Sequence, residues 1–227
     1  MSGKKRYGLK SVSARLLMIL VPVVAVFIVG VTLFVAFQAR KVIIDKAKGE
    51  LHQESRANAE EIGGTITGFK EYFNSLAETL ENTAFGSDQE LIDNFSFCLN
   101  KFEEISNGFY IGLDDKGYID VSGWVPDEGY DPTSRGWYSD GMGKNEMFLG
   151  APYVDADSGT PCVSMSREIT LADKRHGVMS VDIYLSHVSE SVAEYRPAGT
   201  GHAILFDGSQ IIASENTEYN GTEYTEH

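Results

Sequence analysis

The sequence has few of the residues that mark an enzyme, a metal protein or a disulfide-stapled scaffold. It contains two cysteines and six prolines in 227 residues and has no short repeat, which excludes disulfide-rich, collagen-like and low-complexity classes. Five histidines are scattered without metal-ligand spacing, and no Gly-x-Ser-x-Gly, His-Glu-x-x-His or Walker motif occurs. We therefore expect no catalytic centre, no metal and no cofactor. Cys98 and Cys162 are compatible with either a disulfide or two free core thiols.

Basic residues are scarce after residue 48. Residues 1–48 hold nine of the 19 lysines and arginines and a single acidic residue, whereas residues 49–227 hold 10 basic and 32 acidic residues. The formal charge of -14 argues against a nucleic-acid partner. A basic head joined to an acidic body indicates that the two parts occupy different environments.

Residues 16–37 form one uncharged, largely apolar run of 22 residues. As a helix this run spans a hydrocarbon core of about 30 Å. A signal peptide would have a shorter apolar region of about 7–15 residues and a small-residue cleavage site. We therefore predict a cytoplasmic basic tail (1–15), an uncleaved membrane anchor (16–37) and an acidic body outside the cytoplasm. Basic residues flank both ends of the run, so the charge bias that sets orientation is weak.

A long helix is predicted over residues 38–84. From Ile62, apolar residues recur in steps of 4, 3, 4, 3 and 4 to Leu80, which is the spacing of one helical face. Part of so long a helix is expected to pair with a second copy in a homodimer. For the second half of the helix, packing within a single chain is an equally good interpretation.

The remaining pattern predicts an α+β fold. Turn residues separate candidate strands at 109–113, 118–121, 147–154, 162–169 and 177–184, and helices are expected from residue 87, from Pro132 and over 186–195. Five antiparallel strands with flanking helices form one module with the long helix over residues 38–198. A hairpin at 201–214 repeats the pattern of the first hairpin and predicts the start of a second, truncated sheet module at 199–227.

One constellation of polar and aromatic residues carries the candidate chemistry. It consists of Tyr130, Arg135, Trp137, Tyr153, Asp155 and Asp182. Asp182 interrupts an apolar strand, where a carboxylate is costly unless it is paired. From the residues alone, an Arg135–Asp182 ion pair that braces the sheet explains this as well as a binding site does. Asp155-x-Asp157-x-Gly159 lacks a third ligand and a distal glutamate, so it is predicted to be a hairpin turn and not a calcium loop.

These six residues, with their spacing, resemble the double Cache (dCache) extracytoplasmic sensor domain of bacterial chemoreceptors. Within this family, the chain resembles the subfamily that binds free amino acids. The family's sequence pattern also matches the flanking segment Asp131-Pro132-Thr133-Ser134-Arg135-Gly136-Trp137-Tyr138. It extends from about residue 38 to the end of the chain and implies a PAS-like sheet. Receptors of this type carry a complete second module, a second membrane helix and a cytoplasmic output domain, so we expect this chain to be a fragment, a truncated product or one part of a larger system.

The resemblance implies that the six residues bind an amino acid as a zwitterion. Arg135, Trp137 and Tyr130 would bind the carboxylate, and Tyr153, Asp155 and Asp182 would bind the ammonium group. The formal charge of these residues, -1, suits a ligand with a cationic group. The expected function is ligand sensing at the cell membrane, with signalling by helix displacement. The alternatives are the sensor region of a histidine kinase or cyclic-dinucleotide enzyme, or a membrane-anchored structural domain without a ligand.

Overall fold

The computed structural model describes residues 12–224. Most of the predicted basic tail and the last three residues of the predicted second module lie outside the described residues. The chain divides into two compact units, residues 1–55 and 56–227. Helix α1 (Val12–Asn82) supplies the described part of the first unit and continues into the second.

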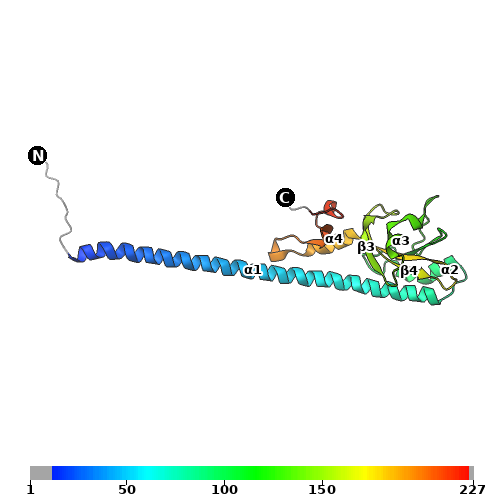
Figure 1. Ribbon diagram of the computed structural model, residues 1–227, viewed down its shortest axis with the longest axis horizontal. Coiled ribbons are helices and arrows are strands. Elements are labelled where there is room, and N and C mark those ends of the chain that lie inside the picture. The colour runs from blue at the N-terminus through cyan, green and yellow to red at the C-terminus, as the bar shows by residue number, and fades with distance from the viewer. Residues whose placement is uncertain (1–11, 225–227) are drawn as a thin grey trace. The chain divides into compact units, whose positions relative to one another are not determined.

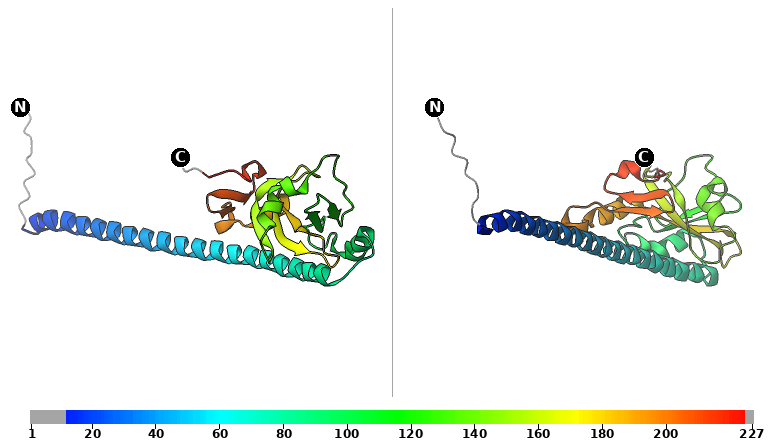
Figure 2. Two further views of the ribbon diagram at one scale, coloured as in Figure 1. Left: turned by 45° about the vertical axis from the view of Figure 1, so that its right-hand side comes forward. Right: turned by 60° about the vertical axis from the view of Figure 1, so that its left-hand side comes forward.

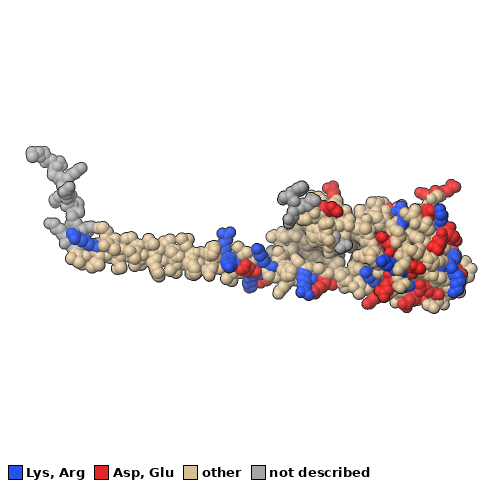
Figure 3. Space-filling model, viewed as in Figure 1, with Lys and Arg blue, Asp and Glu red and all other residues tan. Residues whose placement is uncertain are grey.

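The first unit consists of the N-terminal part of α1. Its apolar side chains are exposed over the whole of residues 16–37, with Phe27 71% exposed and Leu33 65% exposed. Figure 3 shows this stretch without charged groups, which return on both sides of it. The helix is long and apolar enough to cross a membrane. Water is a poor solvent for so continuous an apolar surface.

The second unit is built on a five-stranded antiparallel sheet, as the sequence predicted (Figure 1). The strands are β1 (Phe109–Leu113), β2 (Tyr118–Asp120), β3 (Phe148–Val154), β4 (Pro161–Thr170) and β5 (His176–Tyr184). Their order in the sheet is β2-β1-β5-β4-β3. Tight turns join β1 to β2 and β4 to β5, and each contains a lysine with positive φ, Lys116 and Lys174.

Short helices connect and cover the strands. The α-helices are α2 (Asp88–Phe95), α3 (Gly136–Gly141) and α4 (Leu185–Glu194), and the 3-10 turns are η1 (Ser96–Cys98), η2 (Pro132–Ser134), η3 (Pro197–Gly199) and η4 (Thr217–Tyr219). Helix α2 begins at the predicted cap. The Ser87 hydroxyl accepts from the Glu90 backbone N–H, and the Glu90 carboxylate accepts from the Gly86 N–H.

The main apolar core lies between one face of the sheet and the part of α1 in the second unit, which lie side by side in both views of Figure 2. Helix α1 contributes Phe69, Phe73, Leu76, Ala77 and Leu80 to this core. The predicted apolar stripe therefore packs within its own chain over the second half of the helix. Cys98 and Cys162 are both buried and free, so of the two possibilities that the sequence left open, they are core thiols and not a disulfide.

A separate two-stranded sheet follows α4. It consists of β6 (Ile204–Asp207) and β7 (Gln210–Ser214), which pair antiparallel with a register shift in the middle. Ile211 and Ala213 are its buried apolar residues. The Asn220 side-chain amide donates to the Ser189 hydroxyl of α4 (2.7 Å), which ties this segment to the end of the larger module.

Candidate functional site

The second face of the sheet is hollowed by a cavity. All six residues of the predicted constellation line it, although they come from three separate segments of the chain. The space between their side chains, counted with its open mouth, measures about 430 Å³. The enclosed space alone, without the open mouth, is about 30 Å³, which is smaller than typical small-molecule sites of about 300–1,000 Å³. Sequence reasoning missed other lining residues, which include Tyr110, Tyr118, Asp120, Trp124 and Asp157.

The segment around η2 places Arg135 and Trp137 at the cavity. The Asp131 carboxylate caps η2 by accepting from the Thr133 backbone N–H (3.0 Å), and Pro132 occupies the first turn. Arg135 ends η2 in an extended conformation and directly precedes α3. Trp137, in the first turn of α3, is only 3% exposed. A capped turn followed at once by a helix therefore fixes both side chains.

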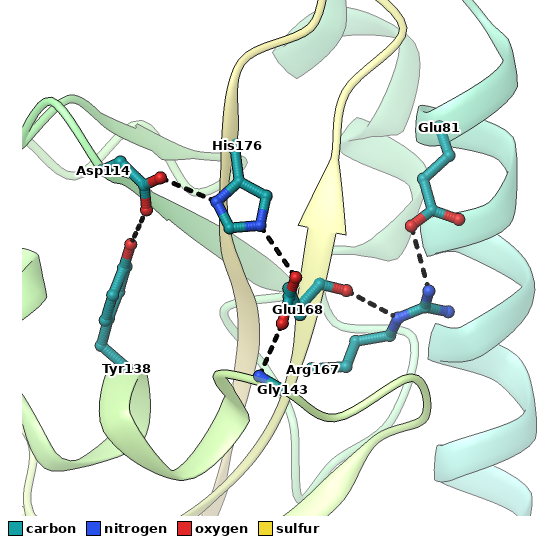
Figure 4. A network of polar contacts seen from close by, with 7 residues as sticks. All are labelled: Glu81, Asp114, Tyr138, Gly143, Arg167, Glu168 and His176. Carbon is teal, nitrogen blue, oxygen red and sulfur yellow. Dashed lines mark hydrogen bonds and ion pairs between the residues drawn. The ribbon is translucent and has the colours of Figure 1, made fainter.

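A polar network beside α3 fastens this helix to the sheet (Figure 4). The Tyr138 hydroxyl donates to Asp114, and His176 joins Asp114 (2.7 Å) to Glu168 (2.9 Å) through its two ring nitrogens. Glu168 in turn accepts from the Gly143 backbone N–H just after α3. These hydrogen bonds raise the pKa of His176 and lower the pKa of both carboxyl groups. The network holds the helix that carries Trp137.

Asp182 projects from the middle of β5 into the cavity. Its Oδ1 accepts from the Tyr110 hydroxyl (2.8 Å) and from the Tyr153 hydroxyl (2.7 Å). Burial raises the pKa of Asp182 to about 7, despite these two donors. Among the described residues no donor reaches Oδ2, and this oxygen is not fully enclosed by protein. The carboxylate therefore presents one unsatisfied oxygen to the cavity.

Arg135 does not neutralise Asp182. Among the ion pairs of the described residues none involves Arg135, whose guanidinium lies 5.9 Å from the centre of the Tyr130 ring. The predicted alternative, an Arg135–Asp182 pair that braces the sheet, is therefore wrong. A half-buried cation and a buried carboxylate line the same cavity without contacting each other.

Asp155 differs from Asp182 because its own turn occupies most of its oxygens. Its carboxylate accepts from the Ser158 backbone N–H (2.9 Å) and hydroxyl, and from the Asp157 backbone N–H at 3.3 Å. This is the predicted hairpin turn. In residues 12–224 no group of three metal-ligating side chains occurs, at this turn or elsewhere. Asp155 still lines the cavity, where its charge contributes to the raised pKa of Asp182.

Aromatic rings form one wall of the cavity. Tyr110 contacts Trp137 edge to face (4.9 Å between ring centroids) and stacks on Tyr118 at 5.8 Å. Trp124 and Tyr130 contact Tyr118, each at 5.5 Å, and contact each other at 5.6 Å. Burial raises the pKa of Tyr130, while Arg135 and the Trp137 indole oppose this rise. One end of the cavity therefore brings together three hydrogen-bond donors, those of Tyr130, Arg135 and Trp137.

Of the missed residues Asp120, Tyr110 and Trp124, only Asp120 carries a signal that the sequence contains. Asp120 ends β2 within an apolar segment and is 7% exposed, so it is a second buried carboxylate of the kind that singled out Asp182. Tyr110 lies in β1, where every residue is buried, so alternation gives no indication of its face. Trp124 lies in an irregular loop without periodicity.

A shallower cavity adjoins the first. Arg135, Trp137 and Tyr153 line both, and the second cavity extends past Asp140 and Pro152, with a volume of about 770 Å³ including its mouth. The three shared side chains therefore stand between two openings on the same face of the sheet.

Fold and cavity together define a ligand-sensing module, and comparison with known proteins identifies its family. Residues 69–190 match the methyl-accepting chemotaxis protein-like family, first PDC sensor domain. The match takes in more than half of the chain, so the protein belongs to this family. The chemoreceptor resemblance that the sequence indicated is confirmed.

Individual relatives are more distant. Methyl-accepting chemotaxis protein McpB of Bacillus subtilis (strain 168) is 27% identical over 185 residues, which are 76% of this chain and 26% of McpB. The chain thus spans about a quarter of the length of this relative. The solved ligand-binding domain of Mlp24 with asparagine superimposes with a TM-score of 0.61 at 21% identity, covering 82% of this chain and 77% of that one.

A second solved domain shares the fold to the same degree. It is the ligand-binding domain of the amino acid chemoreceptor PctC of Pseudomonas aeruginosa PAO1 in complex with GABA, with a TM-score of 0.62 at 19% identity. The alignment covers 75% of this chain and 77% of that one. At such identities the similarity shows a common fold.

Proposed function

We propose that this protein is the extracytoplasmic ligand-sensing region of a transmembrane chemoreceptor and that its cavity binds a free amino acid. The observation that carries the proposal is the separation of opposite charges in one cavity. In the part of the chain that the structure describes, Arg135 has no acidic partner, and Asp182 offers an unsatisfied oxygen to the same space. An amino acid carries both complementary charges and would satisfy both ends.

The carboxylate of the ligand would bind at the Arg135 end. A guanidinium presents two parallel N–H donors that match the two oxygens of a carboxylate. The Trp137 indole N–H and the Tyr130 hydroxyl are next to Arg135 and can donate to the same group. The surrounding aromatic rings exclude water and so strengthen each of these interactions.

The ammonium group would bind at the Asp182 end. The free Oδ2 of Asp182 can accept one of its N–H donors, and the Tyr153 hydroxyl, which donates to Asp182, has lone pairs left to accept another. Asp155 adds negative charge near the ammonium group, but its oxygens already accept hydrogen bonds from Ser158 in its own turn. A ligand without the amino group would leave the buried Asp182 uncompensated, which disfavours binding.

The solved relatives support this assignment. The Mlp24 domain is described with asparagine and the PctC domain with GABA, and both ligands combine a carboxylate with an ammonium group. The two ligands differ in the spacing of these groups. For this chain we propose α-amino acids, because the donor cluster and the Asp182 oxygen face a single small cavity.

Signalling is proposed to pass through helix α1. The apolar stretch at residues 16–37 would anchor the chain in the membrane, and Phe69 to Leu80 of the same helix pack against the sheet. Ligand binding would shift this helix by about 1–2 Å, in a homodimer that the helix helps to form. The ligand can change the free-energy difference between the unshifted and shifted states only by the difference in its binding free energy to them.

A thermal unfolding screen tests the proposal on the full chain in detergent micelles. A ligand at 100 times its Kd adds about 2.7 kcal/mol of stability. We expect a subset of the 20 amino acids to raise the midpoint, and Arg135→Ala to abolish the effect. Arg56→Ala is the matched control, because Arg56 is an exposed arginine that pairs only with Glu60 on its own helix. No shift with any amino acid in folded protein, or an unchanged shift in Arg135→Ala, would contradict the proposal.

A further inference from the structure

The cavity holds more negative charge than a simple amino acid can compensate. Four carboxylates line it, those of Asp120, Asp155, Asp157 and Asp182, against the single guanidinium of Arg135. A zwitterion adds one charge of each sign, so the excess of three negative charges remains after it binds. Asp182 is more than nine-tenths buried, and its Oδ2 faces this space without a donor among the described residues.

A bound zwitterion would leave two of these carboxylates, Asp120 and Asp157, without a cationic partner. Asp120 is the buried one of the two. Its Oδ1 accepts from the Ser122 backbone N–H (2.8 Å), and within residues 12–224 the one hydrogen bond to its Oδ2 comes from the Tyr118 hydroxyl, at 3.3 Å. Asp157, exposed in the β3–β4 turn, lines the same cavity, and its charge adds to the rise in the pKa of Asp120 that burial causes. Two carboxylates that repel each other are a favourable place for a cation.

The position of Asp120 suits a ligand of a particular length. Asp120 on β2 pairs with Tyr110 on β1, and Tyr110 pairs with Ser180 on β5, two residues before Asp182. Asp120 and Asp182 therefore lie on strands separated by β1, with about 10 Å between the two backbones. A ligand that contacts both must be extended. Among amino acids, those with a cation at the end of a three- or four-carbon side chain have this form.

Aromatic side chains complete the environment of this end. Tyr118 and Trp124 contact each other edge to face next to Asp120, and both line the cavity. Faces of tryptophan and tyrosine attract guanidinium and ammonium groups, by about 0.5–2 kcal/mol according to the degree of desolvation. A neutral polar side chain would gain no comparable attraction from these rings or from the carboxylates.

We propose that the Asp120–Asp157 end of the cavity is a second subsite, which selects amino acids with a cationic side chain over neutral ones of the same shape. The inference rests on the proposed function, because it takes the amino and carboxyl groups to bind at Asp182 and Arg135. Asp120 and Asp157 are specificity residues in this arrangement. They contact the far end of the ligand and leave the binding of its α-groups to the six residues already described.

Two matched pairs of ligands test the subsite. L-Arginine and L-citrulline share a shape but differ in side-chain charge, and so do L-lysine and L-2-aminoheptanoic acid, in which a methyl group replaces the ammonium group. We expect calorimetric titration of the full chain in micelles to give a Kd at least tenfold lower for each charged member. Asp120→Asn should reduce this ratio to about threefold or less by weakening arginine while leaving citrulline unchanged. Asp157→Asn, at the exposed edge, should reduce it by a smaller factor. Asp127→Asn, an exposed acidic residue outside the cavity lining, is the control and should leave the ratio unchanged.

The outcomes separate the two levels of the proposal. Equal affinity for arginine and citrulline, or an unchanged ratio in Asp120→Asn, would overturn the subsite and leave the amino acid site intact. If Asp120→Asn does not fold, an unchanged ratio in Asp157→Asn has the same consequence. Failure of folded wild-type protein to bind any amino acid would instead overturn the proposed function.

Discussion

The two faces of the five-stranded sheet are equally buried but opposite in chemistry. Along β5, Met179, Val181 and Ile183 face α1 in the main apolar core, whereas Ser180 and Asp182 alternate with them on the cavity side. None of these five side chains is more than 6% exposed. One strand therefore supplies both the packing that stabilises the fold and the polar groups that would bind the ligand.

The difference between the faces separates stability from binding. On the apolar face, burial contributes about 25 cal/mol for each Å² removed from water. On the cavity face, a carboxylate buried without a cationic partner opposes folding, and its pKa is raised accordingly. Under the proposed function, the ammonium group of a ligand compensates this unfavourable carboxylate. Each face can be altered without the other, which gives the following expectations.

The largest effect is expected from Asp182→Asn on the cavity face. The change keeps the volume and the acceptor for Tyr110 and Tyr153, but it removes the charge that would bind the ammonium group. Loss of one partner of a buried charge pair costs about 3–5 kcal/mol, so amino acid affinity should fall by hundreds to thousands of fold in calorimetric titration. Asp127→Asn is the control. Normal binding by Asp182→Asn would refute the role of this residue.

The same substitution should stabilise the free protein at high pH. The pKa of Asp182 is raised from 3.8 to about 7, so the folded state takes up a proton that the unfolded state does not. Wild-type stability therefore falls as the pH rises from about 4 to about 7, by at most about 4 kcal/mol from this group. Denaturant unfolding at pH 8 should show Asp182→Asn to be more stable than wild type. A less stable variant would contradict this account of the carboxylate.

On the apolar face, a substitution should lower the stability of the protein and leave its affinity for the ligand unchanged. Met179→Ala leaves a cavity in the core and should cost about 2–5 kcal/mol of unfolding free energy, measured with denaturant. Because Met179 points away from the ligand cavity, amino acid affinity at a temperature where the variant is folded should stay within about twofold. Val125→Ala, at an exposed position, is the control for stability. A large loss of affinity in Met179→Ala would show that the two faces are coupled.

Affinity should also depend on pH through Asp182. Below about pH 7 a proton occupies the carboxylate, so it competes with the ligand ammonium. The Kd of wild type should therefore be nearly constant above pH 7. Below pH 7 it should increase by a factor that approaches ten for each unit by which the pH falls. Residual binding by Asp182→Asn should lack this dependence. An affinity that is constant between pH 5.5 and 8 would exclude Asp182 as the ammonium acceptor.

The smallest effect is expected at His176, in the network that fastens α3. Its pKa is raised by Glu168 and Asp114, so the stability that it contributes is present below its unfolded pKa and is lost as the pH rises through the folded value. The side chain is 34% exposed, which limits the contribution to less than about 1 kcal/mol. The difference in stability between wild type and His176→Gln should shrink from pH 5.5 to pH 9.

The sequence was sufficient to predict most of the fold and to single out six residues that line one cavity. Turn residues and apolar runs predicted all five strands, and a charge in the apolar run of β5 singled out Asp182. The face of Tyr110 could not be predicted because β1 is buried on both sides, so alternation is lost. Trp124 was missed for a related reason, since only the course of an irregular loop brings it to the cavity, whereas Asp120 interrupts an apolar segment as Asp182 does and could have been found from the sequence.

The Arg135–Asp182 alternative could be decided only in three dimensions. Opposite charges 47 positions apart in the sequence are compatible with contact or with separation, and spacing does not distinguish them. The course of η2 and α3 holds Arg135 over Tyr130, away from Asp182. Likewise, the sequence could not show that the turn containing Asp155 occupies its oxygens, because these hydrogen bonds depend on the backbone conformation of that turn.

Tryptophan fluorescence gives the most direct test that the cavity binds an amino acid by both charged groups. The chain has two tryptophans, Trp124 and Trp137, and both line the cavity. We predict that titration of the full chain in micelles gives a saturable change in fluorescence with at least one amino acid. We also predict that analogues of that amino acid without its α-amino or its α-carboxyl group give no change at the same concentrations. Equal responses to these analogues, or no response of the folded protein to any amino acid, would contradict the account.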